Sequence, residues 1–370
     1  MNNCRYFDVA GLGMKIEGDN EWIAEYWKYF SSVEVEKEIE PAFLIIRIVK
    51  EINITEKYAS LSQTILFNEN EFVVKKGDYR YKIRNLFGQG TTIVEICHKN
   101  VKDLKHKIKN MIGIAEHATQ GIKEGVVNHI MGYDFMLWVI PVALMKYNRL
   151  FFHCGAMEKD GKAIIITGTS GSGKTGTQLL AMSDYGFRYM ADDFCILSTS
   201  GTAYYFPKKI KIYQSDIEYK NKFIYSAYKK LPVVKKMRWQ IWKKINKDPR
   251  GEFYIEKVFK TDEVVKSAPI GEIIYIARTR SEVIKEYIID DREFSKRTRL
   301  ASFREIRELY NILSNICSVG NEKIRECYPE WRDLESKYEE IMMKVLSNSF
   351  GRRLLEVPEK IHPEEIIKAF

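Results

Sequence analysis

Hydrophobic and polar positions along the first 125 residues follow patterns typical of strands with a few helices. Two short strand patterns flank a glycine turn in 4–18, and the apolar run PAFLIIRIV at 41–49 is typical of a buried strand. Alternation through 65–85, interrupted by turn residues, predicts antiparallel hairpins before a strand at 91–98. Helices are predicted at 21–30, capped by Asn20, and at 101–118. We therefore expect an N-terminal α+β domain over 1–125.

The pattern changes after a predicted helix at about 126–148. From Leu150 the order is strand, glycine-rich loop, helix and strand, as in proteins of the α/β class. The C-terminal part is predicted to be mainly helical, at 302–316 and 331–347. A short strand at 352–358 and a helix beginning at Pro363 follow. The expected fold class is thus α/β (α+β), with a second domain over 126–370.

Composition excludes several classes of protein. Hydrophobic residues make up 45% of the 370 residues, which is enough for a core and argues against wholesale disorder. The longest apolar run, Phe135 to Met145, has 11 residues, whereas a membrane-spanning helix needs about 20. The N-terminus has no signal-peptide pattern, and the six cysteines form no CxxC pair. We expect reduced thiols and a cytoplasmic location.

The net charge of +9 comes from one segment of the chain. Residues 208–260 contain 16 Lys or Arg and 5 Asp or Glu, a local charge of +11, and many aromatic side chains. This basic insertion is compatible with a solvated surface or lid, with substrate docking, or with nucleic-acid binding. Its stretch 235–245 predicts an imperfect amphipathic helix, with Met237 and Ile241 on one side and Trp239 partly off it.

The strongest motif is GTSGSGKT, which fits G-x-x-x-x-G-K-[ST] between an apolar strand and a helix. Glycines in such a loop let successive backbone N–H groups turn toward one phosphate, and the helix N-terminus adds positive potential. The alternative is a glycine-rich turn that matches by chance. The predicted nucleotide-binding residues are Gly168, Thr169, Ser170, Gly171, Ser172, Gly173, Lys174, Thr175 and Gly176.

Two acidic residues and a histidine lie near this motif in the sequence. Asp192 and Asp193 follow the predicted helix by a tight turn, so one carboxylate could bind a metal while the other accepts a proton from a hydroxyl. The alternative interpretation is that the two aspartates lie at an ordinary strand end and form turn contacts or salt bridges. His153 lies on a strand that a hairpin would place beside the phosphate loop, although a lone histidine is more often structural.

Basic residues beyond the acidic pair are weaker candidates. Lys208, Lys209 and Lys211 follow the predicted catalytic strands and are candidate contacts for a phosphoryl acceptor. Arg278 and Arg280 follow the strand EIIYIA and could reach phosphate, but an exposed strand end is the favoured interpretation. The six histidines show no zinc-ligand spacing with cysteines.

The run from His153 to Leu197 resembles the catalytic domain of HPr kinase/phosphorylase, whose fold is related to the core of phosphoenolpyruvate carboxykinase. The resemblance implies a P-loop kinase domain that uses ATP and Mg²⁺. It implies that Asp192 is the general base, that His153 orients it, and that Lys174 holds phosphates. Thr175 and Asp193 would be the metal ligands.

The remainder of the chain departs from that family, since the glycine-rich segment expected downstream is replaced by the basic insertion. The N-terminal stretch is more similar to HPr kinase relatives found with peptide-tailoring gene clusters, which phosphorylate a serine of a precursor peptide. HPr itself is therefore not the expected substrate.

The leading hypothesis is an Mg²⁺-dependent kinase that transfers the γ-phosphoryl group of ATP to Ser or Thr of a peptide or protein, with an acidic acceptor suggested by the basic insertion. A small-molecule kinase and a nucleotide-gated regulatory protein without phosphotransfer remain alternatives. A nucleic-acid-dependent ATPase is disfavoured because no helicase motif is present. We expect no membrane partner, and the resemblance is compatible with a homo-oligomer.

Overall fold

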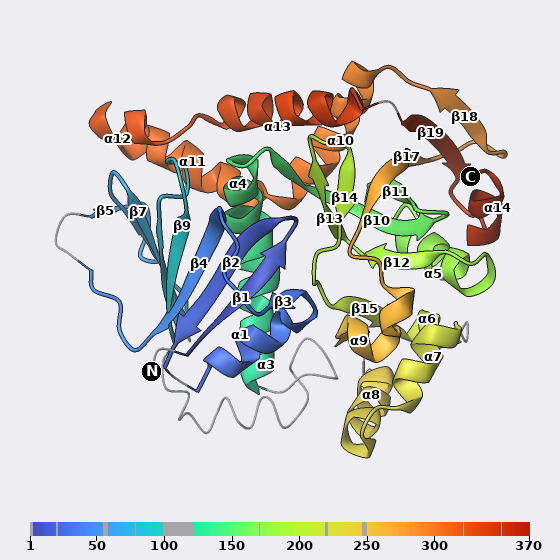
Figure 1. Ribbon diagram of the computed structural model, residues 1–370, viewed down its shortest axis with the longest axis horizontal. Coiled ribbons are helices and arrows are strands. Elements are labelled where there is room, and N and C mark those ends of the chain that lie inside the picture. Colours follow the sequence, from blue (N-terminus) through green and yellow to red (C-terminus); the bar gives the residue numbers. More distant parts are fainter. Residues whose placement is uncertain are drawn as a thin grey trace. The chain divides into compact units, whose positions relative to one another are not determined.

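Figure 1 shows the computed structural model of the chain. The structure describes residues 3–19, 21–54, 58–77, 79–98, 122–169, 171–218, 221–245, 250–320, 322–348 and 350–370. The predicted cap Asn20, the predicted helix at 101–118 and the loop residue Ser170 lie outside the described residues.

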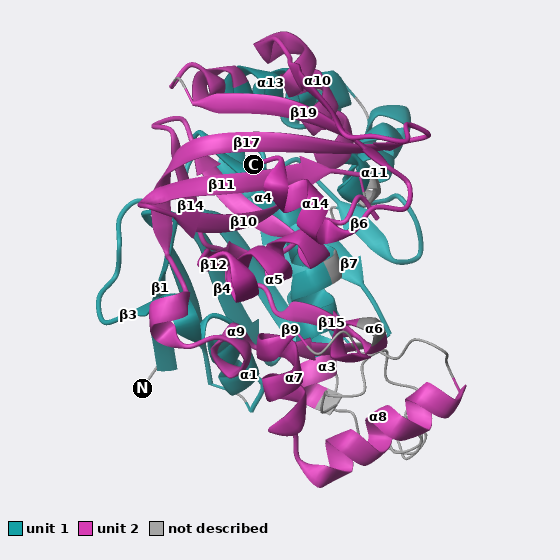
Figure 2. Ribbon diagram, turned by 90° about the vertical axis from the view of Figure 1, so that its right-hand side faces the viewer, with its two compact units in different colours: residues 1–103, 126–151, 303–342 teal, residues 104–125, 152–302, 343–370 magenta. Residues whose placement is uncertain are grey.

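The chain forms two compact units, coloured separately in Figure 2. Unit 1 comprises residues 1–103, 126–151 and 303–342, and unit 2 comprises 104–125, 152–302 and 343–370. The chain therefore passes between the units several times. The domain boundary expected between residues 125 and 126 stays a prediction, because the compact units are a different kind of division from domains read along the sequence.

Unit 1 is built on a nine-stranded sheet of order β3-β1-β2-β4-β9-β8-β7-β6-β5. The strands β2, β4 and β9 run parallel to one another, and the outer pairs are antiparallel. In β4, alternate residues from Ala42 to Ile48 are buried, whereas Ile45, Arg47 and Val49 on the other face are half-buried, so one face of this strand is covered more completely than the other. The strands are β1 (Asn3–Val9), β2 (Leu12–Gly18), β3 (Glu34–Val35), β4 (Ala42–Val49), β5 (Ala59–Ser60), β6 (Ile65–Phe67), β7 (Glu71–Lys75), β8 (Tyr79–Arg84) and β9 (Thr92–His98).

One continuous apolar helix packs against this sheet. Its middle is a π-helical stretch whose Trp138 ring meets Tyr81 and Phe72, while the Phe135 ring also meets Tyr81. The span Lys123–Met145 has the length and composition to cross a bilayer, but 76% of its apolar window is buried inside the protein, which is the behaviour of a core helix. Its parts are α3 (Ile122–His129), η2 (Ile130–Val139) and α4 (Ile140–Met145).

The other helices of unit 1 are short, apart from two in its C-terminal portion. In the predicted helix 302–316 the chain breaks at Ile306, so two helices replace the one expected. These helices are α1 (Ile23–Tyr29), η1 (Ser31–Val33), α11 (Arg307–Val319), α12 (Glu322–Cys327) and α13 (Trp331–Leu346), the last of which ends in unit 2.

Unit 2 contains an eight-stranded sheet of order β11-β10-β13-β14-β17-β19-β18, with β12 paired to β10. An additional parallel pairing of β11 with β17 joins the two sides of this path, so five strands close into a ring. The strands are β10 (Arg149–Lys159), β11 (Lys162–Gly168), β12 (Arg188–Ala191), β13 (Phe194–Ser198), β14 (Thr202–Tyr204), β17 (Ser267–Thr279), β18 (Lys285–Ile288) and β19 (Gly351–Pro358).

The basic insertion and the residues just after it form short elements, with a separate two-stranded sheet. These elements are β15 (Ile210–Tyr213), α6 (Gln214–Glu218), α7 (Lys222–Lys229), α8 (Val233–Ile245), β16 (Arg250–Phe253), α9 (Ile255–Val258) and η3 (Thr261–Glu263). The remaining helices of this unit are α5 (Lys174–Asp184), α10 (Asp291–Glu305) and α14 (Pro363–Lys368).

The mixed α/β character predicted from the sequence is what the structure shows. The hairpin β7–β8, the hairpin β10–β11 and the C-terminal pair β19 and α14 lie where the sequence predicts them. The helix α8 is also present, and the structure shows which of its sides is covered. Trp239 is fully buried, whereas Met237 and Ile241 are exposed.

Candidate active site

The glycine-rich motif lies between β11 and α5, in the strand–loop–helix order that its sequence predicts. Three of its glycines have positive φ, at +145° for Gly168, +79° for Gly171 and +97° for Gly173. A Cβ on Gly168 would lie 2.3 Å from the carbonyl oxygen of Ile276 on β17. Only glycine fits both this backbone conformation and this close approach.

Lys174 begins α5 and is buried, with its ammonium group folded back over the loop. Its Nζ donates to the carbonyl oxygens of Gly168, at 3.0 Å, and Thr169, at 3.1 Å. The Ser172 hydroxyl is also buried and has no hydrogen-bond partner among the described residues. A buried cation and an unsatisfied hydroxyl at a helix N-terminus fit a phosphate group, which supplies both charge and acceptor oxygens.

Asp192 and Asp193 lie between β12 and β13 and face different partners. The Thr175 hydroxyl donates to Asp192 Oδ1 at 2.9 Å, whereas Lys208 forms an ion pair with Asp193. Asp193 also has a φ of +66°, a backbone conformation that aspartate tolerates better than most residues. The turn between the two strands therefore directs one carboxylate to the loop and the other to the basic insertion.

The two carboxyl groups have different proton affinities. Burial and the neighbouring Asp193 raise the pKa of Asp192 to about 7. Burial also opposes ionisation of Asp193, but Lys208 and Lys211 outweigh it and hold the pKa of Asp193 below its usual range. Asp193 is thus the fixed negative charge of the pair, and Asp192 is the carboxyl group whose protonation can change near neutrality.

His153 lies on β10, next to the glycine-rich loop, because Cys154 pairs with Thr167 in the β10–β11 hairpin. The Thr167 hydroxyl donates to the His153 carbonyl oxygen at 2.8 Å. Burial and then Lys174 lower the pKa of His153 to about 4, so its ring is neutral at pH 7. The hairpin predicted from the sequence therefore brings His153, Lys174 and the acidic pair into one region of unit 2.

The three candidate lysines after β14 occupy different surroundings. Lys208 is held by Asp193, and its ammonium group lies 5.0 Å from the centre of the Phe194 ring. Lys209 is buried and forms an ion pair with Glu124 at 2.8 Å. Lys211 on β15 is half-buried. Of the three, Lys211 has the surroundings that best suit contact with an external acceptor.

Two residues contribute to this region in ways that sequence motifs do not reveal. The Gln178 side chain is buried in α5 and donates to the carbonyl oxygens of Ala156, at 2.8 Å, and Ala191, at 2.7 Å, joining α5 to β10 and β12. Arg278 is exposed at the end of β17, as expected, but its Nη2 lies 3.2 Å from the position that a Cβ on Gly173 would occupy. The parallel pairing of β11 with β17 explains this proximity, since the carboxyl ends of parallel strands meet at one edge.

The described residues contain no cluster of three or more His, Cys, Asp or Glu suited to a metal ion. The Thr175 hydroxyl and the Asp192 carboxylate do provide two hard oxygens side by side. Mg²⁺ usually takes one or two such protein ligands and completes its shell with water and nucleotide phosphates. The site therefore fits Mg²⁺ only together with a bound nucleotide.

Comparisons with known proteins add little to this geometry. No family model matches the chain, and no curated protein matches it. Among solved structures, an HPr(Ser) kinase/phosphatase from Coxiella burnetii is similar over 38% of this chain and 72% of its own, with 16% identity and a TM-score of 0.23. A TM-score this low carries no argument about fold or activity, so the case for function rests on the site itself.

Proposed function

We propose that the protein is an ATP-dependent kinase that transfers the γ-phosphoryl group to a Ser or Thr hydroxyl of a peptide or protein. The observation that carries this proposal is the hydrogen bond between Thr175 and Asp192 at the end of the glycine-rich loop. It places a carboxylate beside the residues suited to phosphate and Mg²⁺. A loop that merely matched the motif by chance would not require a buried acid at that point.

Each residue of the site has a role in this proposal. The loop N–H groups and Lys174 bind the phosphates, and Lys174 offsets charge on the phosphoryl group in transfer. Bound Mg²⁺ would neutralise phosphate charge, with Thr175 and a carboxylate of the acidic pair as its protein ligands. Asp192 accepts the proton of the acceptor hydroxyl, and neutral His153 helps to orient it.

The structure suggests a different division of labour between the two aspartates from that implied by the family resemblance. The Asp192 carboxyl group accepts a hydrogen bond from Thr175, whereas the charged Asp193 carboxylate forms an ion pair with Lys208. Asp192 could therefore act as base, as metal ligand, or in both capacities during one turnover. Asp193 would keep Lys208 fixed at the edge of the site.

The test compares Asp192→Asn and Asp193→Asn with Asp160→Asn, a matched change in the exposed β10–β11 turn. Phosphotransfer and ATP binding are measured separately, with and without Mg²⁺. We expect Asp192→Asn to lower phosphotransfer by at least a hundredfold while ATP still binds, because a general base typically contributes 10²–10⁴-fold. Transfer at the wild-type rate in Asp192→Asn would contradict the proposed function.

A small-molecule kinase and a regulatory protein without phosphotransfer share the same loop. Incubating the protein with γ-³²P-ATP and a lysate of the source organism separates the three. Label in macromolecules supports the proposal, label in small molecules supports a metabolite kinase, and tight ATP binding without any transfer supports a regulatory role.

A further inference from the structure

The helix α8 presents a row of apolar side chains to solvent. Their exposed fractions are 71% for Val233, 68% for Val234, 61% for Met237, 49% for Ile241 and 80% for Ile245. From Val234 onward these positions recur at intervals of three and four residues, and Val233 lies four residues before Met237, so all five lie on one side of the helix. We call this row the α8 stripe. Such rows normally face the core of a protein, and here the row faces outward.

The orientation of the stripe is fixed by the opposite face of the helix. Trp239 is fully buried there, its Nε1 donates to Gln214 Oε1 at 2.8 Å, and its ring packs edge-on against Tyr228 at 5.7 Å. Lys243 adds an ion pair with Glu218 at 3.0 Å. The helix can bury only one of its faces against α6 and α7. Because Trp239 is anchored on that face, the α8 stripe points away from α6 and α7.

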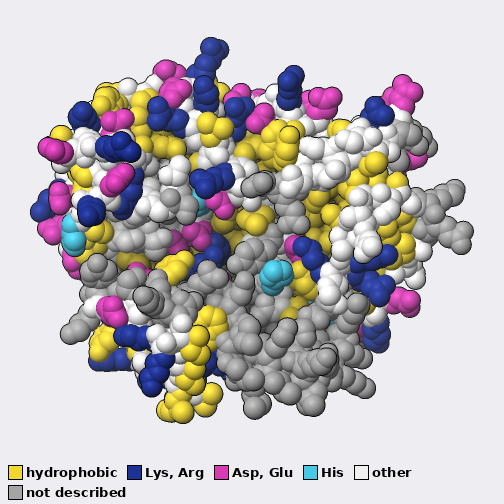
Figure 3. All heavy atoms as spheres, turned by 180° about the vertical axis from the view of Figure 1, so that it is seen from behind, with side chains coloured by type: hydrophobic (Ala, Val, Ile, Leu, Met, Phe, Trp, Pro, Cys, Tyr) yellow, Lys and Arg dark blue, Asp and Glu magenta, His cyan; other side chains and the backbone are white. Residues whose placement is uncertain are grey.

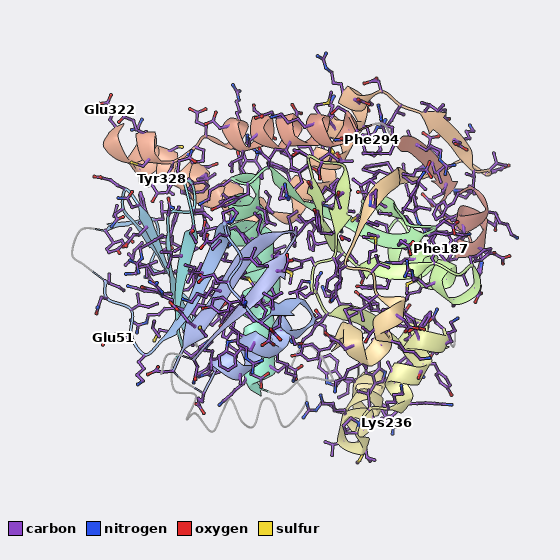
Figure 4. The ribbon with its side chains drawn as sticks, viewed as in Figure 1. Glu51, Phe187, Lys236, Phe294, Glu322 and Tyr328 are labelled. Carbon is purple, nitrogen blue, oxygen red and sulfur yellow. The ribbon has the colours of Figure 1, made fainter. Side chains whose placement is uncertain are left out.

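Charge beside the stripe has a single sign. The helix Val233–Ile245 contains five Lys or Arg residues and no Asp or Glu. Lys244 is exposed next to Ile245, and Lys236, labelled in Figure 4, is half-buried next to Met237, with its Nζ donating to the Lys229 carbonyl oxygen. In Figure 3 hydrophobic and basic side chains lie together in the lower left of the picture, where this helix is seen from behind.

We infer that α8 binds the surface of an anionic lipid bilayer. A helix with an outward apolar face, flanking cations and a nearby tryptophan has the composition of helices that lie in the membrane interface. Trp242, half-buried on α8, would be positioned near that interface. In Figure 2 this helix projects from the rest of unit 2. A projecting helix is better suited to contact a flat surface than a groove-bound partner is.

Charge also argues against a second copy as the occupant. Two α8 helices packed stripe to stripe would bring two sets of cations together without an acid on either helix. An acidic amphipathic peptide would satisfy the charge but is normally bound in a groove between elements. The expectation of no membrane partner rested on the lack of a spanning segment, and interfacial binding requires none.

The experiment is flotation of the full-length protein with vesicles of phosphatidylcholine, alone or mixed with phosphatidylglycerol, at low and high salt. We expect binding only to the mixed vesicles, weakened by salt, with a blue shift of tryptophan fluorescence. The double variant Lys236→Gln/Lys244→Gln is expected to bind roughly thirtyfold more weakly, given the usual contribution of a basic residue near an anionic surface.

The stripe is tested by Met237→Gln/Ile241→Gln, with Val283→Gln/Leu300→Gln as the matched control. The control residues are apolar and similarly exposed, at 60% and 58%, but lie outside α8. Binding lost in the stripe variant and kept in the control supports the inference. The inference would be overturned if both variants bound equally or if the wild type did not bind vesicles. It would also be overturned if an acidic peptide retained the protein in place of vesicles, or if the protein formed a dimer that the stripe variant abolished. None of these readouts depends on phosphotransfer.

Discussion

At the scale of single residues, backbone geometry separates the glycines that the site requires from those that only shape turns. Gly168 and Gly186 both have positive φ, at +145° and +75°. A Cβ on Gly168 would collide with the Ile276 carbonyl oxygen, whereas nothing lies within 4 Å of a Cβ on Gly186. Similar glycines in the sequence therefore have different steric requirements.

We predict that Gly168→Ala lowers the free energy of unfolding by about 2–4 kcal/mol, because backbone strain and a steric clash add. Gly186→Ala should cost about 1 kcal/mol, since it adds strain alone. Urea unfolding of both variants measures the difference. Equal losses would show that the contact with Ile276 does not constrain the loop.

A second residue-scale prediction concerns His98 in unit 1. Its ring stacks on Trp22 at 4.0 Å and shares a hydrogen bond of 3.0 Å with the Tyr26 hydroxyl. Burial lowers the pKa of His98 from 6.5 to about 4. Between these values the unfolded chain binds more protons than the folded chain. Stability is therefore lost as pH falls from 6.5 toward 4, by up to about 1.4 kcal/mol per pH unit.

The His98→Phe variant keeps an aromatic ring on Trp22 and removes the titrating group. It should lose less stability than the wild type between pH 6.5 and 4.5, although its stability at pH 7 is lower because the hydrogen bond with Tyr26 is lost. Denaturant unfolding across this pH range gives the comparison. Parallel pH profiles would remove His98 as the cause.

Sequence patterns named the candidate residues of the site but not their contacts. The fixed spacing of the motif singles out Gly168, Lys174 and Thr175 as candidates, because phosphate-binding loops with this motif place those residue types at those positions. That Thr175 contacts Asp192, and that Lys208 contacts Asp193, depends on how the β12–β13 turn directs two adjacent carboxylates. A sequence pattern cannot show that two adjacent side chains point to different partners.

At the scale of elements, α5 depends on the last helix of the chain. The helix α14 packs against α5, with Pro363 Cγ 3.6 Å from the position of a Cβ on Gly176 and Ile366 Cδ1 3.9 Å from that on Gly173. Ile366 and Ile367 are both buried, but Ile366 is the one next to the loop. The helix α14 thus supports the end of the glycine-rich loop.

Ile366→Ala and Ile367→Ala should each lower the free energy of unfolding by about 2–4 kcal/mol, as is usual for truncating a buried isoleucine. Only Ile366→Ala is expected to lower ATP affinity further, by severalfold, because it removes the contact beside Gly173. Isothermal titration calorimetry below the unfolding temperature measures this. Equal effects on affinity would argue against specific support by Ile366.

Another element, the π-helical stretch η2, is tied to the sheet of unit 1 by a buried polar contact. The Tyr79 hydroxyl donates to Asp134 Oδ2 at 2.7 Å, and Asp134 is only 1% exposed. Tyr79→Phe would leave a buried carboxylate short of one donor, so a loss of about 1–3 kcal/mol in unfolding free energy is expected. Tyr58→Phe provides the control, since Tyr58 contacts the half-buried Glu71. A smaller loss for Tyr79→Phe than for Tyr58→Phe would contradict this.

Periodicity predicted most elements but did not show which side of a helix is buried or where a helix breaks, because tertiary packing decides both. The apolar positions of α8 were visible in the sequence, but Trp239 rather than Met237 and Ile241 became the buried side. A large ring with one N–H buries more surface against Gln214 and Tyr228 than the smaller side chains would. The break at Ile306 likewise has no glycine or proline to announce it.

At the scale of the whole molecule, two large sheets belong to two units, and the proposed nucleotide site belongs to unit 2 alone. A ligand stabilises the part of a protein that binds it, by about 2.7 kcal/mol at a concentration of a hundred times Kd. Binding of nucleotide should therefore affect the two units unequally.

We predict that MgATP slows hydrogen exchange in β11, α5 and β12, with a smaller effect on the sheet of unit 1. The Lys174→Ala variant should show no such protection because it loses a main phosphate contact. Mass spectrometry of peptides from both units makes the measurement. Uniform protection across both sheets would mean that the units respond to nucleotide as one.

The sequence indicated the mixed α/β class but could not show which segments share a unit. Unit 1 combines residues 1–103 with 126–151 and 303–342. Helical periodicity in 331–346 indicates a helix, but it does not indicate which unit that helix belongs to. Long-range partnership of this kind is a property of packing, and no local pattern encodes it.

The support of the glycine-rich loop by α14 has a consequence for how the protein is made. The loop precedes β17, β19 and α14 in the sequence, so it is synthesised before any of them. A growing chain on the ribosome therefore contains the motif before it contains the supports. Under the proposed function, full nucleotide affinity is expected only once α14 has been synthesised and has packed against α5.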